Sequence, residues 1–413
     1  MSDAAIQDRG PPAGGLRDRA TAADMRIARV EAWWVRVPIE TAQQHRSDFG
    51  QITTFDAAIV RVQTKSGIVG WGEGKNAAGS AGTYGALVHL LNTEIGPAVI
   101  GRDARDVSTI WDMLYSGVRH ESAARSGHVM PALARRGLTI AAMSAIDIAL
   151  WDILGKSLGE PVWRLLGGRK AERMPAYASG GWAPADQIGE QLQSYIARGG
   201  FSAVKMRVGS MDHAPHVSAS RVRAAREALG PDVALMVDAH GSYSVDDARR
   251  FAHLVRDCDL AWFEEPVTAD DKQGLAEVRS ACAIPIACGE SEATRFDFRD
   301  LAVMRAADIF QPDLGFCGGI TEAMRIGALA SAFNIRLAPH LWAGAPAFYA
   351  GMHVAAASPA SFILEYSLGA NPMLHDLVVE KLDVADGTIA IPDAPGLGIT
   401  VDEDYLRAHA FGA

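Results

Sequence analysis

Three carboxylates follow short apolar segments in the second half of the chain. Asp238 follows "ALMV", Glu264 follows "LAWF", and Glu290 follows "IACG". If these segments are neighbouring strands, the carboxylates share one space and repel one another unless a cation lies between them. Oxygen ligands without Cys or His favour Mg²⁺. The sequence therefore predicts a magnesium site, although the doublet "EEP" leaves open whether Glu264 or Glu265 is the ligand.

Two cations lie in the segment "AVKMR", at Lys205 and Arg207. Alternate residues of a strand share a face, so both side chains point into the same space. Removing a proton from a guanidinium at neutral pH would cost roughly 9 kcal/mol, which makes arginine a poor base. We therefore expect Arg207 to hold a carboxylate or an enediolate electrostatically. Lys205 is then either a base with a lowered pKa or a second hydrogen-bond donor.

The elements that carry these residues repeat with a period near 25 residues. One strand, one helix and two loops account for this length, and parallel strands buried on both faces form an α/β barrel with functional residues at the carboxyl ends of the strands. Eight strands are expected, at "RMPAYAS", "AVKMR", "ALMVDAH", "AWFEEP", "IACGES", "IFQPD", "IRLAPH" and "FILEY".

The first part of the chain has a different pattern. Strand-like segments joined by a Ser-Gly turn precede a long apolar helix, "GLTIAAMSAIDIALWDILGKSLG". We predict a flexible extension at residues 1–24, an α+β capping domain at 25–150, a barrel at 151–377, and a segment at 378–413 that returns to the capping domain.

Composition excludes several classes of protein. A formal net charge of −10 without a basic stripe argues against nucleic-acid binding. The sequence has no run of 18 apolar residues, so we expect no membrane span. The four cysteines lack the spacing of zinc sites and a secretory context, which favours a reducing, cytoplasmic location.

The ordered series "KMR", "VDAH", "FEEP", "GES", "QPD", "PH" and "EY" resembles the enolase superfamily, mandelate racemase branch. The resemblance extends from Met25 to at least Leu382. It implies a modified (β/α)7β barrel under an α+β capping domain, Mg²⁺ on Asp238, Glu264 and Glu290, and abstraction of the proton α to a carboxylate. It also implies association into a homo-oligomer.

The resemblance assigns roles to the remaining polar residues. His340 is the expected base, and Asp313 orients its imidazole as carboxylates do in other dyads. Glu365 is expected to donate a hydrogen bond to the substrate carboxylate, which requires its protonated form in the complex. In similar sugar-acid dehydratases a histidine at the position of His240 is the general acid. In racemases of this branch the position of Arg207 is a lysine base.

One base and one acid favour β-elimination of water from an aldonic or aldaric acid, giving a 2-keto-3-deoxy acid. A cycloisomerase of a sugar-acid lactone or anhydro-sugar acid is the nearest alternative. A racemase or epimerase would need Lys205 or Arg207 as a second base. A non-catalytic barrel protein is the least favoured. Substrate determinants are expected in the loops "ETAQQHRSDFGQ" and "KNAAGSAG".

Overall fold

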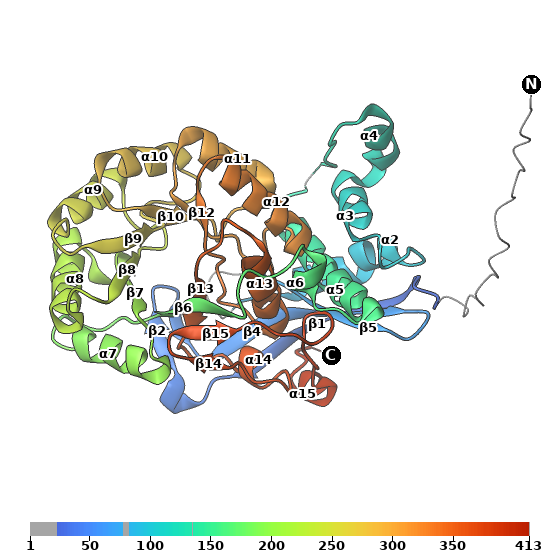
Figure 1. The fold of residues 1–413 in the computed structure, drawn as a ribbon, viewed down its shortest axis with the longest axis horizontal. Helices are drawn as coiled ribbons and strands as arrows, with labels where there is room; N and C mark the ends of the chain where they lie inside the picture. The colour runs from blue at the N-terminus through green and yellow to red at the C-terminus, as the bar shows by residue number, and fades with distance from the viewer. Residues whose placement is uncertain (1–22, 77–81, 134, 413) are drawn as a thin grey trace, which may run out of the picture.

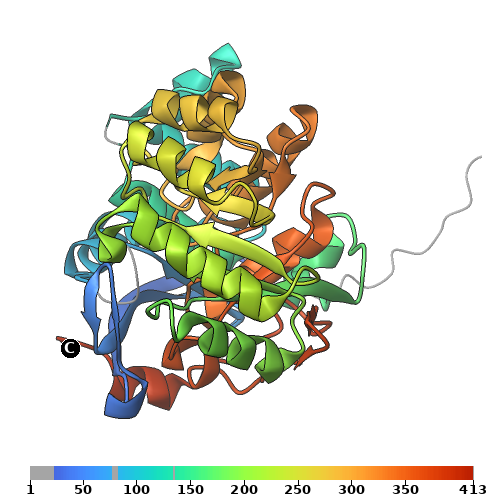
Figure 2. The ribbon, with the colours of Figure 1, turned by 90° about the vertical axis from the view of Figure 1, so that its left-hand side faces the viewer.

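The computed structural model describes residues 23–76, 82–133 and 135–412, so nearly all of the predicted extension and the middle of "KNAAGSAG" lie outside the described residues. Figure 1 shows an α/β barrel beside a smaller domain that contains a sheet, and Figure 2 shows the same arrangement from the side.

The capping domain is built on an antiparallel sheet in the order β1-β4-β5, with a small hairpin, β2–β3, inserted after β1. Residues 48 and 49 form the tip of this hairpin, because Ser47 pairs with Gly50. The strands are β1 (Ile27–Pro38), β2 (His45–Ser47), β3 (Gly50–Ile52), β4 (Thr54–Thr64) and β5 (Val69–Gly74). The helices are α1 (Gly85–Leu90), α2 (Gly96–Val99), α3 (Val107–Ser116), α4 (His120–Ser126) and α5 (Leu138–Leu158).

Alternating glycines let β5 lie directly on α5. A Cβ atom at Gly72 would overlap the carbonyl oxygen of Ala145, and Gly70 meets Ala149 in the same way. Alternate residues of the strand face the helix, so a side chain at either position would separate the two elements. The segment "GIVGWGEG" is therefore a packing surface.

α5 joins the capping domain to the barrel, which is why the predicted boundary at residue 150 falls inside this helix. It is the one described helix long and apolar enough to cross a membrane, and it lies largely buried within the protein. Its Asp147 accepts a hydrogen bond from the Thr321 amide at 2.9 Å. Burial raises the pKa of Asp147 to about 7.

Eight parallel strands and seven helices form the barrel between Arg173 and Ser367, as predicted (Figure 1). The sheet runs in order from β12 to β6, β13 pairs with β6, and a bridge between Leu337 and Ser361 closes the ring. The strands are β6 (Arg173–Ser179), β7 (Ala203–Arg207), β8 (Ala234–Asp238), β9 (Leu260–Glu264), β10 (Ile286–Cys288), β11 (Ile309–Phe310), β12 (Arg336–Leu337) and β13 (Leu364–Ser367). The helices are α7 (Ile188–Gly199), α8 (Pro215–Leu229), α9 (Val245–Leu254), α10 (Lys272–Ala281), α11 (Thr294–Met304), α12 (Gly319–Ala332) and α13 (Ala345–Ala357), with α6 (Val162–Leu165) before the barrel.

One side chain from each strand or its immediate flank fills the barrel interior. This cluster consists of Tyr177, Ala203, Met236, Trp262, Ala287, Ile309, Ala338 and Ile363. Because alternate residues share a face, the residue two positions further along each strand also points inward, nearer the carboxyl end. In seven strands that position holds a polar residue: Ser179, Lys205, Asp238, Glu264, Gln311, His340 or Glu365.

The C-terminal segment contacts both parts of the protein. After α14 (Pro372–His375), the hairpin of β14 (Val384–Ala385) and β15 (Thr388–Ala390) adds to β6. The chain then reaches the capping domain through α15 (Glu403–Ala408), and the Phe411 amide donates to the Trp34 carbonyl at 2.7 Å.

Candidate active site

Two adjoining cavities lie at the carboxyl ends of the barrel strands. The inner chamber, of about 30 Å³, is lined by the predicted lysine, arginine and histidines together with Phe49 from the capping domain. The outer vestibule, of about 860 Å³, lies between the barrel and capping-domain residues such as Arg46. The chamber and the vestibule share Gly180, Arg207, Trp342 and Ser367.

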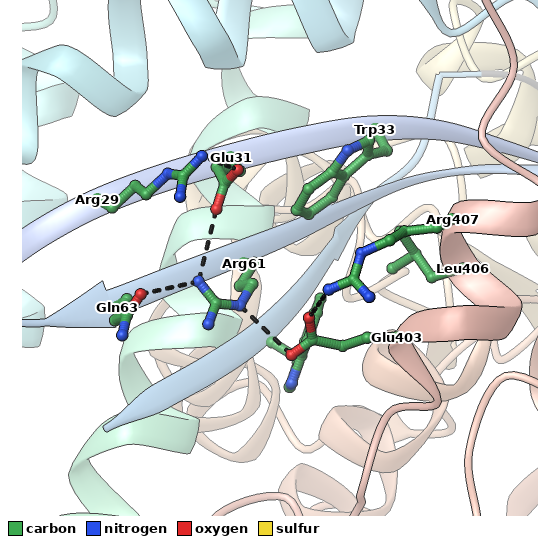
Figure 3. A pocket seen from close by; sticks show the side chains of 9 residues that line it. Arg29, Glu31, Trp33, Arg61, Gln63, Glu403, Leu406 and Arg407 are labelled. Atoms are coloured by element: carbon green, nitrogen blue, oxygen red, sulfur yellow. Dashed lines mark hydrogen bonds and ion pairs between the residues drawn. The ribbon is translucent and has the colours of Figure 1, made fainter. Parts of the chain in front are cut away.

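A third cavity, of about 330 Å³, lies on the capping-domain sheet beside α15 (Figure 3). Its charges pair among themselves: Arg61 contacts Glu31 and Glu403, and Glu403 also binds Arg407. It contains neither a histidine nor any of the predicted site residues, so the chamber is the better candidate for chemistry.

The three predicted metal ligands end neighbouring strands. Asp238 and Glu264 are register partners on β8 and β9, and Glu290 follows β10. Asp238, Glu290 and His240 have ligand atoms within 4.8 Å of one another. Glu264 directs one oxygen to Lys205 and the other to Trp262 Nε1 at 2.9 Å, so it stands outside this group.

These residues fit a hard divalent cation. Asp238 and Glu264 are buried and Glu290 is largely so, and all three present oxygen atoms, the donors that Mg²⁺ prefers. Glu265 adds a buried Oε1 atom that has no hydrogen-bond partner among the described residues. Burial and the Glu290 and Asp238 charges raise the pKa of Glu265 well above its usual range. A cation held by Asp238, Glu264 and Glu290 would offset this accumulation of negative charge.

Lys205 is surrounded by carboxylates. Its ammonium group lies 2.5 Å from Glu264, 3.2 Å from Glu365 and 3.4 Å from Asp238. Burial lowers the pKa of Lys205, but these charges outweigh burial and raise the pKa well above its usual range. Of the two roles expected for Lys205, the geometry therefore favours the hydrogen-bond donor over the base.

Glu365 is an acceptor in this structure. The Ser179 hydroxyl donates to it at 2.6 Å and the Leu341 amide at 2.8 Å. Burial raises the pKa of Glu365, but Lys205, His340 and these donors lower it to about 2. The expected proton on Glu365 is thus not held in the free site, and binding of a substrate carboxylate would have to bring it there.

Arg207 and His240 are both held by Asp48, at the tip of the β2–β3 hairpin. Asp48 Oδ1 lies 2.9 Å from the Arg207 guanidinium, and Oδ2 lies 2.6 Å from His240 Nδ1. Phe49 contacts the His240 ring, with centroids 5.1 Å apart. The capping domain therefore places a carboxylate and an aromatic ring in the barrel mouth.

His240 is held in a strained backbone conformation, with φ at 44°. Its Nε2 atom lies 3.0 Å from Asp238. Burial lowers the pKa of His240, but Asp238 and Asp48 raise it well above its usual range. A histidine that keeps its proton in this way is suited to act as an acid.

His340 and Asp313 form the expected dyad. His340 Nδ1 lies 2.7 Å from Asp313 Oδ2, while Nε2 faces the chamber, 3.5 Å from Glu290. Burial and Lys75 lower the pKa of His340, but Glu290, Glu365 and Asp313 raise it overall. The Asp313 carboxylate can only accept, so Nδ1 of His340 carries a hydrogen and donates it in the hydrogen bond. The lone pair of a neutral His340 therefore lies on Nε2, where a base is needed.

Sequence reasoning missed four residues that contact the predicted ones: Asp48, Lys75, Ser179 and Gln311. Ser179 and Gln311 could have been found, because each lies two positions after an interior residue of the barrel. Asp48 and Lys75 lie in the two loops expected to recognise substrate, but no pattern in those loops indicates which charges they meet.

Comparison with known families agrees with this geometry. Residues 25–167 match the mandelate racemase / muconate lactonizing enzyme N-terminal domain, and residues 187–405 match the enolase C-terminal domain-like family. The chain belongs to the enolase superfamily, in the mandelate racemase / muconate lactonizing enzyme group.

Three related proteins span almost the whole fold. D-galactarolactone cycloisomerase of Agrobacterium fabrum is 34% identical, with 84% of this chain and 89% of the relative aligned. Arabinonate dehydratase of Saccharolobus solfataricus is 32% identical, with 86% of this chain and 90% of the relative aligned. A racemase from Streptomyces coelicolor, solved with bound magnesium, has a TM-score of 0.80 and 30% sequence identity to this chain. The match covers 93% of this chain and 99% of the racemase.

Proposed function

We propose that this protein is an acid-sugar dehydratase, which removes the C2 proton of an aldonic or aldaric acid and expels the 3-hydroxyl group as water. The product is a 2-keto-3-deoxy acid. The observation that carries the proposal is the pair of carboxylate-bound histidines in one chamber: His340 on Asp313, and His240 on Asp48.

The two histidines divide the proton transfers between them. His340 Nε2 takes the C2 proton, and the electrons of the C–H bond form the enediolate. These electrons then form the C2–C3 double bond as the C3–O bond breaks, and His240 gives its proton to the departing hydroxyl. Water leaves, and the enol tautomerises to the 2-keto acid. His240 keeps the proton that it must give, because Asp238 and Asp48 raise its pKa. His340 must be neutral to act as the base, which requires a pH above its raised pKa.

Positive charge must accumulate where the enediolate forms, because a proton beside a carboxylate is very weakly acidic. A bound Mg²⁺, held by Asp238, Glu264 and Glu290, would supply most of this charge. Lys205 donates hydrogen bonds at the carboxylate end. Arg207 lines both the chamber and the vestibule, and we expect it to hold a substrate carboxylate or the enediolate electrostatically.

A cycloisomerase is the second candidate, and the named cycloisomerase relative favours it. The same proton would be removed, but a ring oxygen would leave in place of hydroxyl. A racemase is less well supported, because Lys205 is paired with three carboxylates and Arg207 with Asp48, which leaves neither group free as a second base.

The test is a screen of pooled acid sugars with Mg²⁺ in D₂O, using semicarbazide to detect 2-keto acids and proton NMR to follow C2. A 2-keto-3-deoxy product that is lighter than its open-chain substrate by one water, as mass spectrometry shows, supports dehydration. A keto product with the mass of its lactone or anhydro-sugar substrate contradicts dehydration and favours cycloisomerisation, because a ring oxygen that leaves gives the same enol without loss of water. Loss of the C2 proton signal without a keto product contradicts dehydration and favours epimerisation.

Variants then separate the roles of the two histidines. We expect His340→Asn to abolish both product formation and C2 exchange, whereas His240→Asn abolishes product formation but keeps exchange. His253→Asn, an exposed histidine on α9, is the control and should leave both rates unchanged. Unchanged turnover in His240→Asn would exclude its role as the acid.

A further inference from the structure

Lys75 brings a cation from the capping domain to the Asp313–His340 dyad. It follows the last residue of β5, and its amide donates to the Gly315 carbonyl at 3.0 Å. The approach is close, because a Cβ atom at Gly315 would lie 3.3 Å from both the Cβ and the amide nitrogen of Lys75. The main chain of Lys75 is therefore fixed against the loop that carries Asp313.

The Lys75 side chain converges with His340 on one oxygen atom. Its Nζ atom lies 2.8 Å from Asp313 Oδ2, the same atom that lies 2.7 Å from His340 Nδ1. Nζ also contacts the Trp342 carbonyl and His340 Nδ1, both at 3.4 Å. The other Asp313 oxygen, Oδ1, accepts from the Gly315 amide at 2.9 Å. Three donors thus fix both oxygens of this carboxylate.

We infer that Lys75 is a positioning residue for the base: it holds the Asp313 carboxylate in the plane that orients His340, so that Nδ1 carries the proton and Nε2 faces the substrate. The inference rests on the proposed role of His340 as the base. Lys75 itself does not touch the chamber and transfers no proton.

The geometry explains why a lysine is suited to this place. An ammonium group donates but cannot accept hydrogen bonds, so it cannot take the Nδ1 proton of His340. It binds Asp313 and the Trp342 carbonyl together, which links the loops after β11 and β12. Without it, His340 would be the remaining donor to Oδ2 among the described residues, and the carboxylate and imidazole could turn together.

The first test compares the wild type, Lys75→Met and Lys75→Arg, with the substrate that the acid-sugar screen identifies. We expect Lys75→Met to lower kcat and C2 exchange about ten- to hundred-fold, the size of effect of a small misplacement of a catalytic group. KM should stay within about twofold, and Lys75→Arg should restore part of the rate.

Lys156→Met is the matched control. Lys156 is a partly buried lysine that donates to the Val69 carbonyl at the other end of β5, at 3.0 Å, and to Asp152 of α5 at 2.6 Å. Its loss should reduce stability and leave kcat unchanged. A raised KM in Lys75→Met, or a kcat in that variant equal to that of the wild type, would overturn the inference.

A second test needs no substrate, so it separates this inference from the proposed reaction. The full chain is labelled with ¹⁵N-histidine, loaded with MgCl₂ and studied by NMR, with His340→Asn assigning the His340 resonances. In the wild type, at a pH above the raised pKa of His340, we expect a protonated Nδ1 and an unprotonated Nε2, and in Lys75→Met a shifted or mixed pattern. Identical His340 resonances in both proteins would overturn the inference even if the enzyme proved to be a cycloisomerase.

Discussion

His353 offers a measurable link between pH and stability. It lies on α13, fully buried, where its Nδ1 accepts from the Trp163 amide at 3.2 Å and its Nε2 donates to the Leu397 carbonyl at 3.1 Å. It thus joins the barrel to the segment before it and to the C-terminal segment. Burial lowers the pKa of His353 from 6.5 to about 4.

The sign of the effect follows from where the proton binds. Between these two pKa values the unfolded chain takes up a proton at His353 and the folded protein does not, so lowering the pH favours unfolding. The contribution of His353 is fully present above pH 6.5 and is lost as the pH falls towards 4. A difference of about 2.5 pKa units corresponds to roughly 3 kcal/mol, of which about 2 kcal/mol should be lost by pH 5.

The assay is urea unfolding at pH 7.5, 6, 5 and 4.5 and constant ionic strength, for the wild type and His353→Gln. A glutamine amide can accept and donate as this imidazole does but does not titrate, so the variant removes the pH dependence of this one site. We expect the difference in unfolding free energy between the two proteins to change by about 2 kcal/mol between pH 7.5 and 5. Parallel pH curves would refute the reasoning.

Three further outcomes are expected. Asp48→Asn should lower kcat at least about tenfold in the substrate assay, because Arg207 and His240 lose a shared charge; an unchanged kcat would contradict this role. Gly72→Ala should lower the unfolding free energy by more than about 3 kcal/mol or prevent folding, since its Cβ atom would overlap α5; a stability near the wild type would contradict that packing. Chelation by EDTA should abolish turnover and lower Tm, and MgCl₂ should restore both, because the carboxylates around Lys205 would otherwise repel one another; a Tm that does not respond to Mg²⁺ would contradict the metal site.

The sequence allowed the barrel to be predicted because its pattern is regular. Apolar segments recur near every 25 residues, and the alternation of side chains along a strand places Asp238, Glu264 and His340 above an interior layer of apolar residues. The magnesium ligands and the Asp313–His340 dyad were within reach of this reasoning and of the family resemblance, and they remain predictions until metal binding and turnover are measured.

The surroundings of these residues could not be predicted in the same way. Lys75 and Asp313 are 238 positions apart, and Arg207 and Asp48 are 159 apart. No periodicity connects a loop of one domain with a strand end of another. The pKa of Lys205 could not be predicted from the sequence either. It depends on the positions of three carboxylates around the ammonium group and not on the neighbours of Lys205 in the chain.

The β2–β3 hairpin has a consequence for redesign of the enzyme. Its residues line both cavities, Phe49 the chamber and Arg46 the vestibule, which makes it an obvious segment to exchange when a new substrate is wanted. The tip of the hairpin carries Asp48, on which Arg207 and His240 of the barrel depend. A grafted loop that lacked a carboxylate at this point would alter the hairpin and also remove the partner of His240, the proposed acid. Libraries that vary this hairpin should therefore keep Asp48 fixed and diversify the residues around it.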